Sequence, residues 1–261
     1  MYHFVGSFDH LMGISLERFN SQLDFLQKTY SPEEIVLTFD HGTKDHFDIA
    51  APELERRGLK GIFFLLTMIQ EEQKIPTIDK QRRLESKYRA KLANMLCQDL
   101  GVAYRPEAAR EYLSEFRFYS LEERYLRYLR DTCVPKIVYE KFIEKHFSKM
   151  FGNQNDLVSK EYLNWDHVKE LHHRGHVIGS HSHHHYGDAD DFEVSLQLIA
   201  NVTGERPKCI SYPNGVKNIS DDELRALKID IAYLSSQEGG HFYRSPRIDC
   251  NQFSESLSGV V

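Results

Sequence analysis

The chain has 261 residues and a net charge of −6, with 33 basic residues, 39 acidic residues and 14 histidines. A chain of this length can bury a substantial core, and it fits one large α/β domain as well as two small ones. Hydrophobic residues make up 41% and charged residues 28%, which is ordinary globular usage. No dense run of lysine and arginine is present, so nothing in the charge pattern indicates a nucleic-acid partner.

Cysteine spacing and apolar runs indicate where the protein works. The four cysteines, Cys97, Cys133, Cys209 and Cys250, lie far apart without a CxxC pair, so we expect reduced thiols. No apolar run approaches the roughly 18 residues of a transmembrane helix. The start of the chain also lacks the basic and apolar regions of a secretory signal. The sequence therefore predicts a cytoplasmic protein with no transmembrane segment.

The first part of the chain alternates between helix and strand patterns. Residues 19–30 carry apolar side chains at helical spacing, and a strand is predicted at 35–39. A helix is predicted over 44–57, ending at Gly58 as its C-terminal cap. Residues 60–67 form a continuously apolar strand, as expected in a sheet that is covered on both faces. This strand–helix–strand order predicts a parallel sheet and an α/β fold.

Residues from about 69 to 160 interrupt this alternation. They are rich in Glu, Lys, Arg, Leu and Tyr. Their apolar spacing predicts helices over about 79–98, 106–116, 120–131 and 135–149. We interpret the segment as a helical insertion that forms a lid or an oligomer surface.

The alternation resumes in the last hundred residues. Helices are predicted at 165–173, at about 190–202 and from Ser220 onward, and strands at 176–180, 208–212, 230–235 and 246–250. Acidic residues in the first turn after Ser220 suit the positive end of a helix dipole.

Three polar segments come directly after predicted strands: Asp40-His41, His181–His185 and Pro213–Gly215. In a parallel barrel the strand ends lie on one rim, where active sites are assembled. His181 and His185 are four residues apart, so one helical turn would place both imidazoles on one face. Together with an Asp or His from another strand end, they would make a three-ligand metal site with open positions. The sequence thus predicts an enzyme.

Simpler interpretations of the same residues stay open. A histidine pair at this spacing is often surface decoration, and a lone Asp40 at a strand end would usually cap the following helix. His183 and His184 are interpreted as spacers, although either could serve as a ligand instead.

The polar segments resemble the motifs of one known family. Residues 38–42 (Thr-Phe-Asp-His-Gly) resemble the Thr-Phe-Asp-Asp-Gly signature of the polysaccharide deacetylases, carbohydrate esterase family four. Residues 181–185 fit the His-Ser/Thr-x-x-His metal motif of this family, and 212–215 fit its Tyr-Pro-x-Gly loop. Residues 245–248 look like its later Pro-Arg-Ile segment.

The resemblance covers about 1–67 and 160–250 and leaves the helical insertion unexplained. It implies an irregular parallel (β/α)7-type barrel. We therefore expect one domain over 1–261, interrupted by the insertion at about 69–160.

Catalytic roles also follow from the resemblance, position by position. Asp40 would be the general base that takes a proton from the attacking water. Arg247 would orient Asp40, and the backbone N–H of Asn214 would stabilise the oxyanion. The chain lacks the C-terminal Leu-x-His segment that supplies the acid in many members. Tyr2-His3 resembles the Tyr-His pair of the circularly permuted exopolysaccharide-deacetylase branch, so His3 would protonate the leaving amine.

The metal ligands implied by the resemblance are His181, His185 and the residue after Asp40. That residue is usually Asp in the family but is His41 here. An imidazole can bind zinc as well as a carboxylate can, and a three-histidine site is known zinc chemistry. We expect one divalent metal, zinc first, with nickel or cobalt as alternatives. Alternatively, the imidazole of His41 does not reach the position that a carboxylate would occupy, and the site then binds metal weakly or not at all.

These residues together predict a metal-dependent hydrolase that removes an N-acetyl group from an amino sugar. The expected substrate is an N-acetylated sugar in nucleotide- or lipid-linked form, a precursor in surface-polysaccharide assembly such as O-antigen biosynthesis. Two alternatives stay open: a hydrolase of another carbon–nitrogen bond, such as a formyl amide or cyclic ureide, and a catalytically silent carbohydrate-binding homologue. The helical insertion could also form an oligomer contact.

Overall fold

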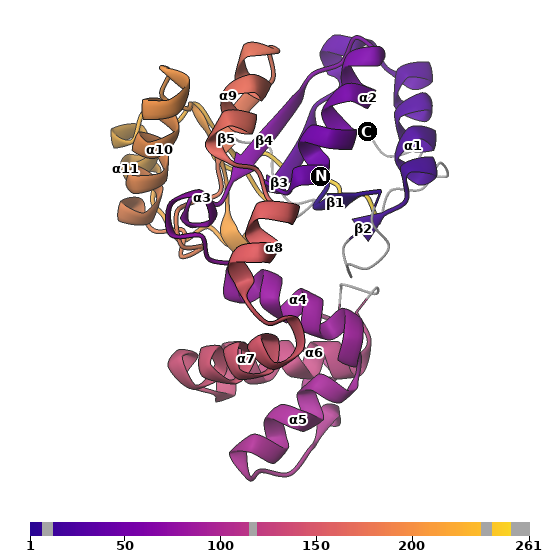
Figure 1. The fold of residues 1–261 in the computed structure, drawn as a ribbon, viewed down its shortest axis with the longest axis vertical. Helices are drawn as coiled ribbons and strands as arrows, with labels where there is room; N and C mark the ends of the chain where they lie inside the picture. Colours follow the sequence, from indigo (N-terminus) through magenta and orange to yellow (C-terminus); the bar gives the residue numbers. More distant parts are fainter. Residues whose placement is uncertain (7–12, 115–118, 236–241, 252–261) are drawn as a thin grey trace. The chain divides into compact units, whose positions relative to one another are not determined.

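The computed structural model describes residues 1–6, 13–114, 119–235 and 242–251. These residues form two compact units (Figure 1). The barrel unit contains the described residues up to Lys74 and from Asn155 onward, and the helical unit runs from Ile75 to Gln154. The expected insertion therefore forms a compact unit with narrower limits than 69–160. No helix among the described residues is both long and apolar enough to cross a membrane.

Five parallel strands form the main sheet of the barrel unit, in the order β3-β4-β5-β6-β7. Their bounds are β3 (Leu37–His41), β4 (Gly61–Leu65), β5 (Val177–Ser180), β6 (Cys209–Ser211) and β7 (Ile231–Tyr233). Every residue of β3 is buried, and Phe39 pairs with Phe63, which pairs in turn with Ile178. Burial of both faces explains why β4 carries a continuous apolar run.

Helices surround this sheet (Figure 1). The barrel unit contains α1 (Leu16–Thr29), η1 (Pro32–Glu34), η2 (His46–Ala50), α2 (Ala51–Arg56), α3 (Met68–Glu72), α8 (Gln154–Glu161, after its first residue), α9 (Trp165–His173), α10 (Ala189–Thr203), η5 (Pro213–Gly215) and α11 (Asp221–Ala226). Phe19 of α1 and Leu54 of α2 share one hydrophobic core with Phe39 and Phe63, whose rings stack with centroids 4.8 Å apart. These contacts fix the strand ends that carry the polar segments.

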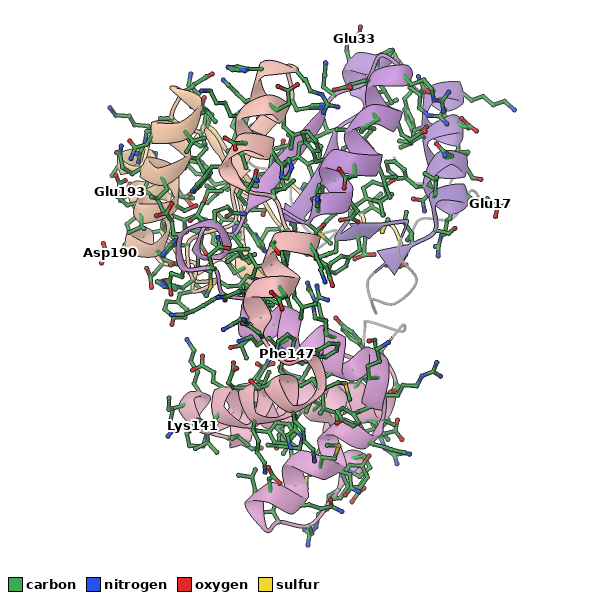
Figure 2. All side chains as sticks on the ribbon, in the orientation of Figure 1. Glu17, Glu33, Lys141, Phe147, Asp190 and Glu193 are labelled. Atoms are coloured by element: carbon green, nitrogen blue, oxygen red, sulfur yellow. The ribbon has the colours of Figure 1, made fainter. Side chains whose placement is uncertain are left out.

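Helix α10 shows how the sequence pattern produces this arrangement. Phe192 and Leu196 are buried in a core formed with strands β6 and β7. Asp190 and Glu193 point away from the sheet (Figure 2). One apolar and one charged face are what a helix on the outside of a sheet requires.

The ends of the described chain lie along the two edges of the sheet. Tyr2 N donates to Thr38 O over 2.8 Å, and Asp40 N donates to Tyr2 O over 3.0 Å, so the N-terminus lies along β3. At the other edge, Leu234 N donates to Ser245 O over 2.8 Å.

The same two segments also contact each other, because Cys250 N donates to Met1 O over 3.0 Å. They therefore join one edge of the sheet to the other. The short parallel pair β1 (Phe4–Val5) and β2 (Gly13–Ile14) continues from the N-terminal segment.

The predicted α/β fold with a parallel, barrel-like sheet is confirmed. The predicted strand at 246–250 is wrong, since none of these residues belongs to a strand and the isolated bridge to Tyr233 is made by Ser245, just before them. Among the described residues the main sheet has five strands, and β1 and β2 form a separate pair.

The helical unit contains α4 (Thr77–Tyr88), α5 (Lys91–Leu100), η3 (Pro106–Ala109), α6 (Leu121–Tyr128), η4 (Leu129–Cys133) and α7 (Lys136–Phe151). The single helix predicted over 79–98 is two helices, because Arg89 adopts a φ of 49°. The helix predicted over 106–116 is wrong over residues 110–114, and residues 115–116 lie outside the described part of the chain. Only Ala109 of this short turn is buried, and a helix that buries so little has no packing to sustain further turns.

Buried charge distinguishes the interior of the helical unit. Arg127 donates to both carboxylate oxygens of Glu85, over 2.7 and 3.2 Å. The Arg127 guanidinium also lies 3.9 Å from the centroid of the Tyr119 ring. Tyr139 donates to Gln81 over 2.8 Å in the same interior. These polar pairs specify how the helices of this unit pack.

Candidate metal centre and active site

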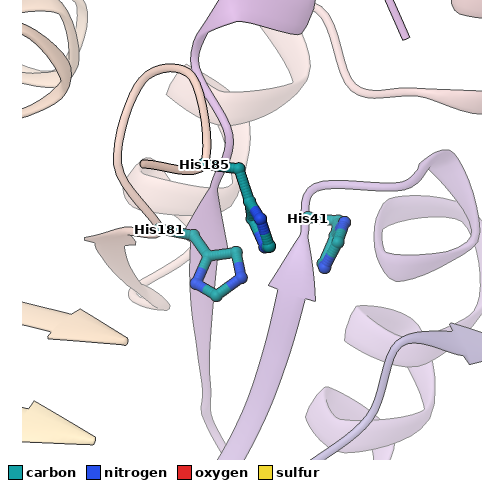
Figure 3. A group of neighbouring side chains, drawn as sticks. All are labelled: His41, His181 and His185. Carbon is teal, nitrogen blue, oxygen red and sulfur yellow. The ribbon is translucent and has the colours of Figure 1, made fainter. Parts of the chain in front are cut away.

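Three imidazoles converge at the strand ends of the barrel unit (Figure 3). His41 is the last residue of β3, His181 directly follows β5, and His185 lies four residues later. Each offers a ligand atom within 4.8 Å of the others. Ring centroids are 5.1 Å apart for His41 and His181, 5.6 Å for His41 and His185, and 5.0 Å for His181 and His185. His41 and His181 are buried, and His185 is half-buried.

A bent loop, rather than a turn of helix, brings His181 and His185 together. The expected helical turn is wrong, because Ser182 has a φ of 68° and His185 a φ of 65°. Ser182 N donates to the hydroxyl of Ser180, and His183 N donates to Asp191 O over 3.2 Å, so these amides bond outside any helical pattern. Left-handed backbone at residues other than glycine costs roughly 1–3 kcal/mol each and is typical of functional loops.

The orientation of His181 depends on Ser211, the last residue of β6. Nδ1 of His181 lies 3.0 Å from the Ser211 carbonyl oxygen and 2.6 Å from its hydroxyl oxygen. A proton on Nδ1 donates to these oxygens, which leaves the lone pair on Nε2 for a metal. Burial lowers the pKa of His181 to about 3, so this imidazole is in the neutral form that a metal ligand requires.

Asp40 is a buried carboxylate paired with Arg247. Arg247 Nη1 donates to Oδ1 over 2.7 Å, and Nη2 donates to Oδ2 over 2.9 Å. Burial by itself would raise the pKa of Asp40, but the positive charge of Arg247 holds it well below its usual range. The Ser211 hydroxyl also donates to Oδ1 over 3.2 Å, which links this carboxylate to His181. Asp40 does not cap the following helix, because Asp45 occupies the N-cap position of η2.

His3 lies against the same cluster. It is buried, and its ring centroid is 5.4 Å from that of His41. The His3 carbonyl oxygen accepts from the Thr43 hydroxyl over 3.2 Å and lies 2.9 Å from Nε2 of His46. These bonds hold the N-terminal segment beside the three imidazoles, and the acid role of His3 stays a prediction.

Asn214 lies in the turn that follows β6. It has a φ of 56° and an exposed side chain, three residues after Ser211. The turn therefore begins at the strand end that contacts His181. The role of the Asn214 N–H as an oxyanion donor stays a prediction.

The donor set fits a divalent metal of the zinc class. The ligand atoms of His41, His181 and His185 all lie within 4.8 Å of one another. His41 therefore supplies a third donor at the position where the family usually has Asp. Three imidazole nitrogens are a ligand set of hydrolytic zinc sites, which keep a further position for water. The carboxylate of Asp40 lies next to this set, paired with Arg247.

Sequence reasoning missed Ser211. A serine at the end of a strand carries no charge and belongs to none of the recognised motifs. Its position just before the Tyr-Pro-x-Gly loop was the only available signal. The structure shows that its hydroxyl joins Asp40 to His181.

Comparisons with known proteins bear on the fold. No protein-family model and no curated protein sequence matches this chain. Among solved structures, a de-N-acetylase from Aggregatibacter actinomycetemcomitans is similar at 14% identity and a TM-score of 0.58, covering 100% of this chain and 97% of that one. IcaB from Ammonifex degensii is similar at 16% identity and a TM-score of 0.54, covering 96% and 92%.

A third similar structure is a polysaccharide deacetylase from Bacillus cereus. It has 12% identity and a TM-score of 0.51, and the match covers 99% of this chain and 67% of that one. The chain therefore has the fold of the polysaccharide deacetylases, as its motifs predicted.

Proposed function

We propose that this protein is a metal-dependent hydrolase that removes an N-acetyl group from an amino sugar. The observation that carries the proposal is the ionised Asp40, held by Arg247 beside three converging imidazoles. A base and a metal site side by side are what hydrolysis of an unactivated amide needs. The fold shared with a de-N-acetylase and a polysaccharide deacetylase supports the same class of reaction.

Each residue of the site has a part in this reaction. A divalent metal held by His41, His181 and His185 would polarise the acetyl carbonyl and make water more acidic. Asp40 accepts the proton of the attacking water, because its pKa is held low enough to keep it ionised. Arg247 fixes the direction of that carboxylate.

The leaving group and the developing charge involve two further residues. The N–H of Asn214 stabilises the negative charge that develops on the carbonyl oxygen. His3 gives a proton to the departing nitrogen, so the amine leaves neutral and acetate is the other product. The buried position of His3 next to His41 supports this assignment.

The proposed substrate is an N-acetylated amino sugar in a polysaccharide or in its nucleotide- or lipid-linked precursor. The shared fold with the polysaccharide deacetylase from Bacillus cereus supports a polysaccharide. The precursor form, a place in surface-polysaccharide or O-antigen assembly, a cytoplasmic location and zinc as the native metal rest on the sequence alone. An oligomer contact through the helical unit likewise stays a prediction.

The two rival functions make different demands on the site. A binding-only protein does not require an ionised Asp40 paired with Arg247, since apolar residues in place of a buried ion pair often give equal stability. A hydrolase of a formyl amide or cyclic ureide would use the same base and metal. Only the products separate it from a deacetylase.

The test is product analysis with the untagged full chain, supplied with zinc, nickel or cobalt. The panel contains N-acetylated amino-sugar oligosaccharides, nucleotide-linked N-acetyl sugars, an O-acetylated sugar, an N-formyl sugar and a cyclic ureide. We expect acetate and free amine in equal amounts from an N-acetylated sugar. Asp40→Asn should lose about 10²- to 10⁴-fold in rate while its three imidazoles still bind metal.

Other products would contradict the proposal in defined ways. Formate release or ureide opening, without acetate, would assign the site to another carbon–nitrogen bond. No product from any substrate, with the three-histidine site shown to be loaded, would favour the carbohydrate-binding alternative.

A further inference from the structure

A second group of metal-ligating side chains lies outside the site described above. Glu72, His183 and His184 each offer a ligand atom, and these atoms lie within 4.8 Å of one another. Glu72 is the last residue of α3, and the two histidines come from the loop between β5 and α10. None of the three belongs to the proposed deacetylase machinery.

Both imidazoles point the same ring nitrogen at one carboxylate oxygen. Glu72 Oε1 lies 2.7 Å from Nε2 of His184 and 3.5 Å from Nε2 of His183. The two rings are nearly perpendicular, with an interplanar angle of 75° and centroids 4.2 Å apart. Two imidazole nitrogens and one carboxylate oxygen therefore lie within 4.8 Å of one another, on rings that face the carboxylate at different angles.

The opposite ring nitrogens face oxygens that orient the two rings. Nδ1 of His183 lies 2.9 Å from the hydroxyl of Thr67, which is fully buried. Nδ1 of His184 lies 3.5 Å from Oδ1 of Asp191. A hydroxyl or carboxylate behind the ligating imidazole is the usual outer shell of a protein metal site, because it fixes the tautomer and the ring direction.

Asp191 is itself fixed in place. Its carboxylate accepts from the backbone N–H of His184 over 2.8 Å, of Tyr186 over 2.9 Å and of Gly187 over 3.2 Å. The loop is therefore folded around this carboxylate. The two histidines are held in position by backbone geometry as well as by their side-chain contacts.

We propose that Glu72, His183 and His184 form a second binding site, specific for a divalent ion of the zinc class. Two imidazoles and one carboxylate suit zinc, nickel or cobalt, whereas magnesium and calcium prefer sites made only of oxygen. Three protein ligands on a half-buried surface leave further positions for water.

The second site binds its ion more weakly than the three-histidine site. Lys74 Nζ lies 2.8 Å from the other Glu72 oxygen, Oε2, and this ammonium competes with any cation for the same carboxylate. The site is also more exposed, since the side chains of Glu72 and His184 are 30% and 38% exposed.

An ion at this site would connect α3 to the loop that carries His181 and His185. Backbone bonds already join these segments, because Met68 N donates to His183 O over 3.2 Å and Thr67 N donates to Ser182 O over 3.4 Å. A shared metal would add a stronger link between them. The second ion therefore stabilises the strained loop on which the first metal site depends.

Zinc stoichiometry of the untagged full chain tests the proposal. The chain is equilibrated by dialysis against buffered free zinc, and bound metal is measured by mass spectrometry. We expect two ions per chain at saturation, one retained after dialysis into metal-free buffer and one lost. Glu72→Gln and His184→Gln should each bind one ion, whereas His181→Ala His185→Ala should lose the other.

Two further variants sharpen the test. Glu71→Gln makes the same change of charge on the neighbouring residue, which accepts from the Trp165 indole over 2.8 Å, and should still bind two ions. Lys74→Ala removes the competing ammonium and should tighten the weaker site. A gain of affinity cannot come from misfolding.

The proposal is overturned if the wild type saturates at one ion, or if Glu72→Gln still binds two, which would locate the second ion elsewhere. It is also overturned if Lys74→Ala leaves the weaker affinity unchanged. None of these results depends on catalysis, so failure here is distinct from failure of the proposed function.

Discussion

Arg247 donates to both carboxylate oxygens of Asp40 across 207 positions of sequence. The side chains are 3% and 2% exposed, so water screens this pair very little. The contact joins β3 to the C-terminal segment that lies along Met1. One ion pair thus orients the proposed base and helps to hold the two edges of the sheet together.

Replacing Arg247 should separate these two effects. Arg247→Lys keeps the charge but loses the two-pronged contact, so a misdirected Asp40 should lower kcat by about 100-fold with metal content unchanged. Arg247→Met leaves Asp40 buried without a partner and should reduce the free energy of unfolding by about 3–5 kcal/mol. Steady-state kinetics measure the change in kcat, and urea unfolding measures the change in the free energy of unfolding. Equal stability of Arg247→Met and wild type would show that the pair is not required for the fold.

Ser211→Ala should weaken metal binding at the three-histidine site. The variant removes the hydroxyl that contacts Nδ1 of His181 and donates to Asp40, but keeps the backbone carbonyl. Loss of such an outer contact typically lowers metal affinity about 10-fold or more. Competition with a chromogenic chelator measures the affinity. Ser86→Ala, which loses a hydroxyl bond to Arg83 O in the helical unit, is the control and should leave affinity unchanged.

Stability should fall as the pH drops below about 6.5, the ordinary pKa of histidine. His176 is buried, accepts from Gly61 N–H through Nδ1 over 3.1 Å, and donates from Nε2 to Glu55 over 2.9 Å. Burial lowers its pKa, so between the folded and unfolded pKa values the unfolded chain binds the extra proton. The contribution of His176 to the free energy of unfolding is therefore fully present above pH 6.5. As the pH falls below this value, the contribution decreases by at most about 1.4 kcal/mol per pH unit.

Urea unfolding of the metal-free protein between about pH 7.5 and 5.5 checks this direction. His176→Gln removes the titrating group and should give a shallower dependence than wild type. Identical slopes for the two proteins would show that His176 does not carry the effect.

The helical unit should depend on the buried Glu85–Arg127 pair. Arg127→Met leaves the carboxylate of Glu85, whose side chain is 0% exposed, without its counter-charge. This should cost about 3–5 kcal/mol of unfolding free energy, and the double variant Glu85→Leu Arg127→Met should recover most of the loss. Thermal and urea unfolding measure the three proteins. A double variant as unstable as the single one would show that the pair itself, rather than an orphaned charge, supplies the stability.

Regular strands were predictable because their signal is local. The apolar run at 60–67 contains β4 (Gly61–Leu65), and the run at 35–39 overlaps β3 (Leu37–His41). The closure of the sheet was not predictable in detail. Single backbone bonds, such as Cys250 N to Met1 O, impose no periodic pattern on the side chains of either segment.

The candidate site was predictable where residues carry charge inside a recognised motif. Asp40, His41 and Arg247 are of this kind, and the structure brings them near His181 and His185. The loop geometry was not predictable, because the positive φ of Ser182 has no signature in a non-glycine residue. Glu72 was missed for a different reason: 112 positions separate it from His184, so only the fold reveals the contact.

The most direct test of the account is the zinc content of the untagged chain in the Glu72→Gln background, so that the three-histidine site is counted alone. The comparison is the same chain with both His181 and His185 changed to alanine, with acetate release measured on each sample. The account predicts about one tightly held ion per chain, as for a three-ligand catalytic site, and loss of both ion and acetate release in the comparison. A parent chain that holds no ion and releases no acetate, even after zinc, nickel or cobalt is added back, would contradict it.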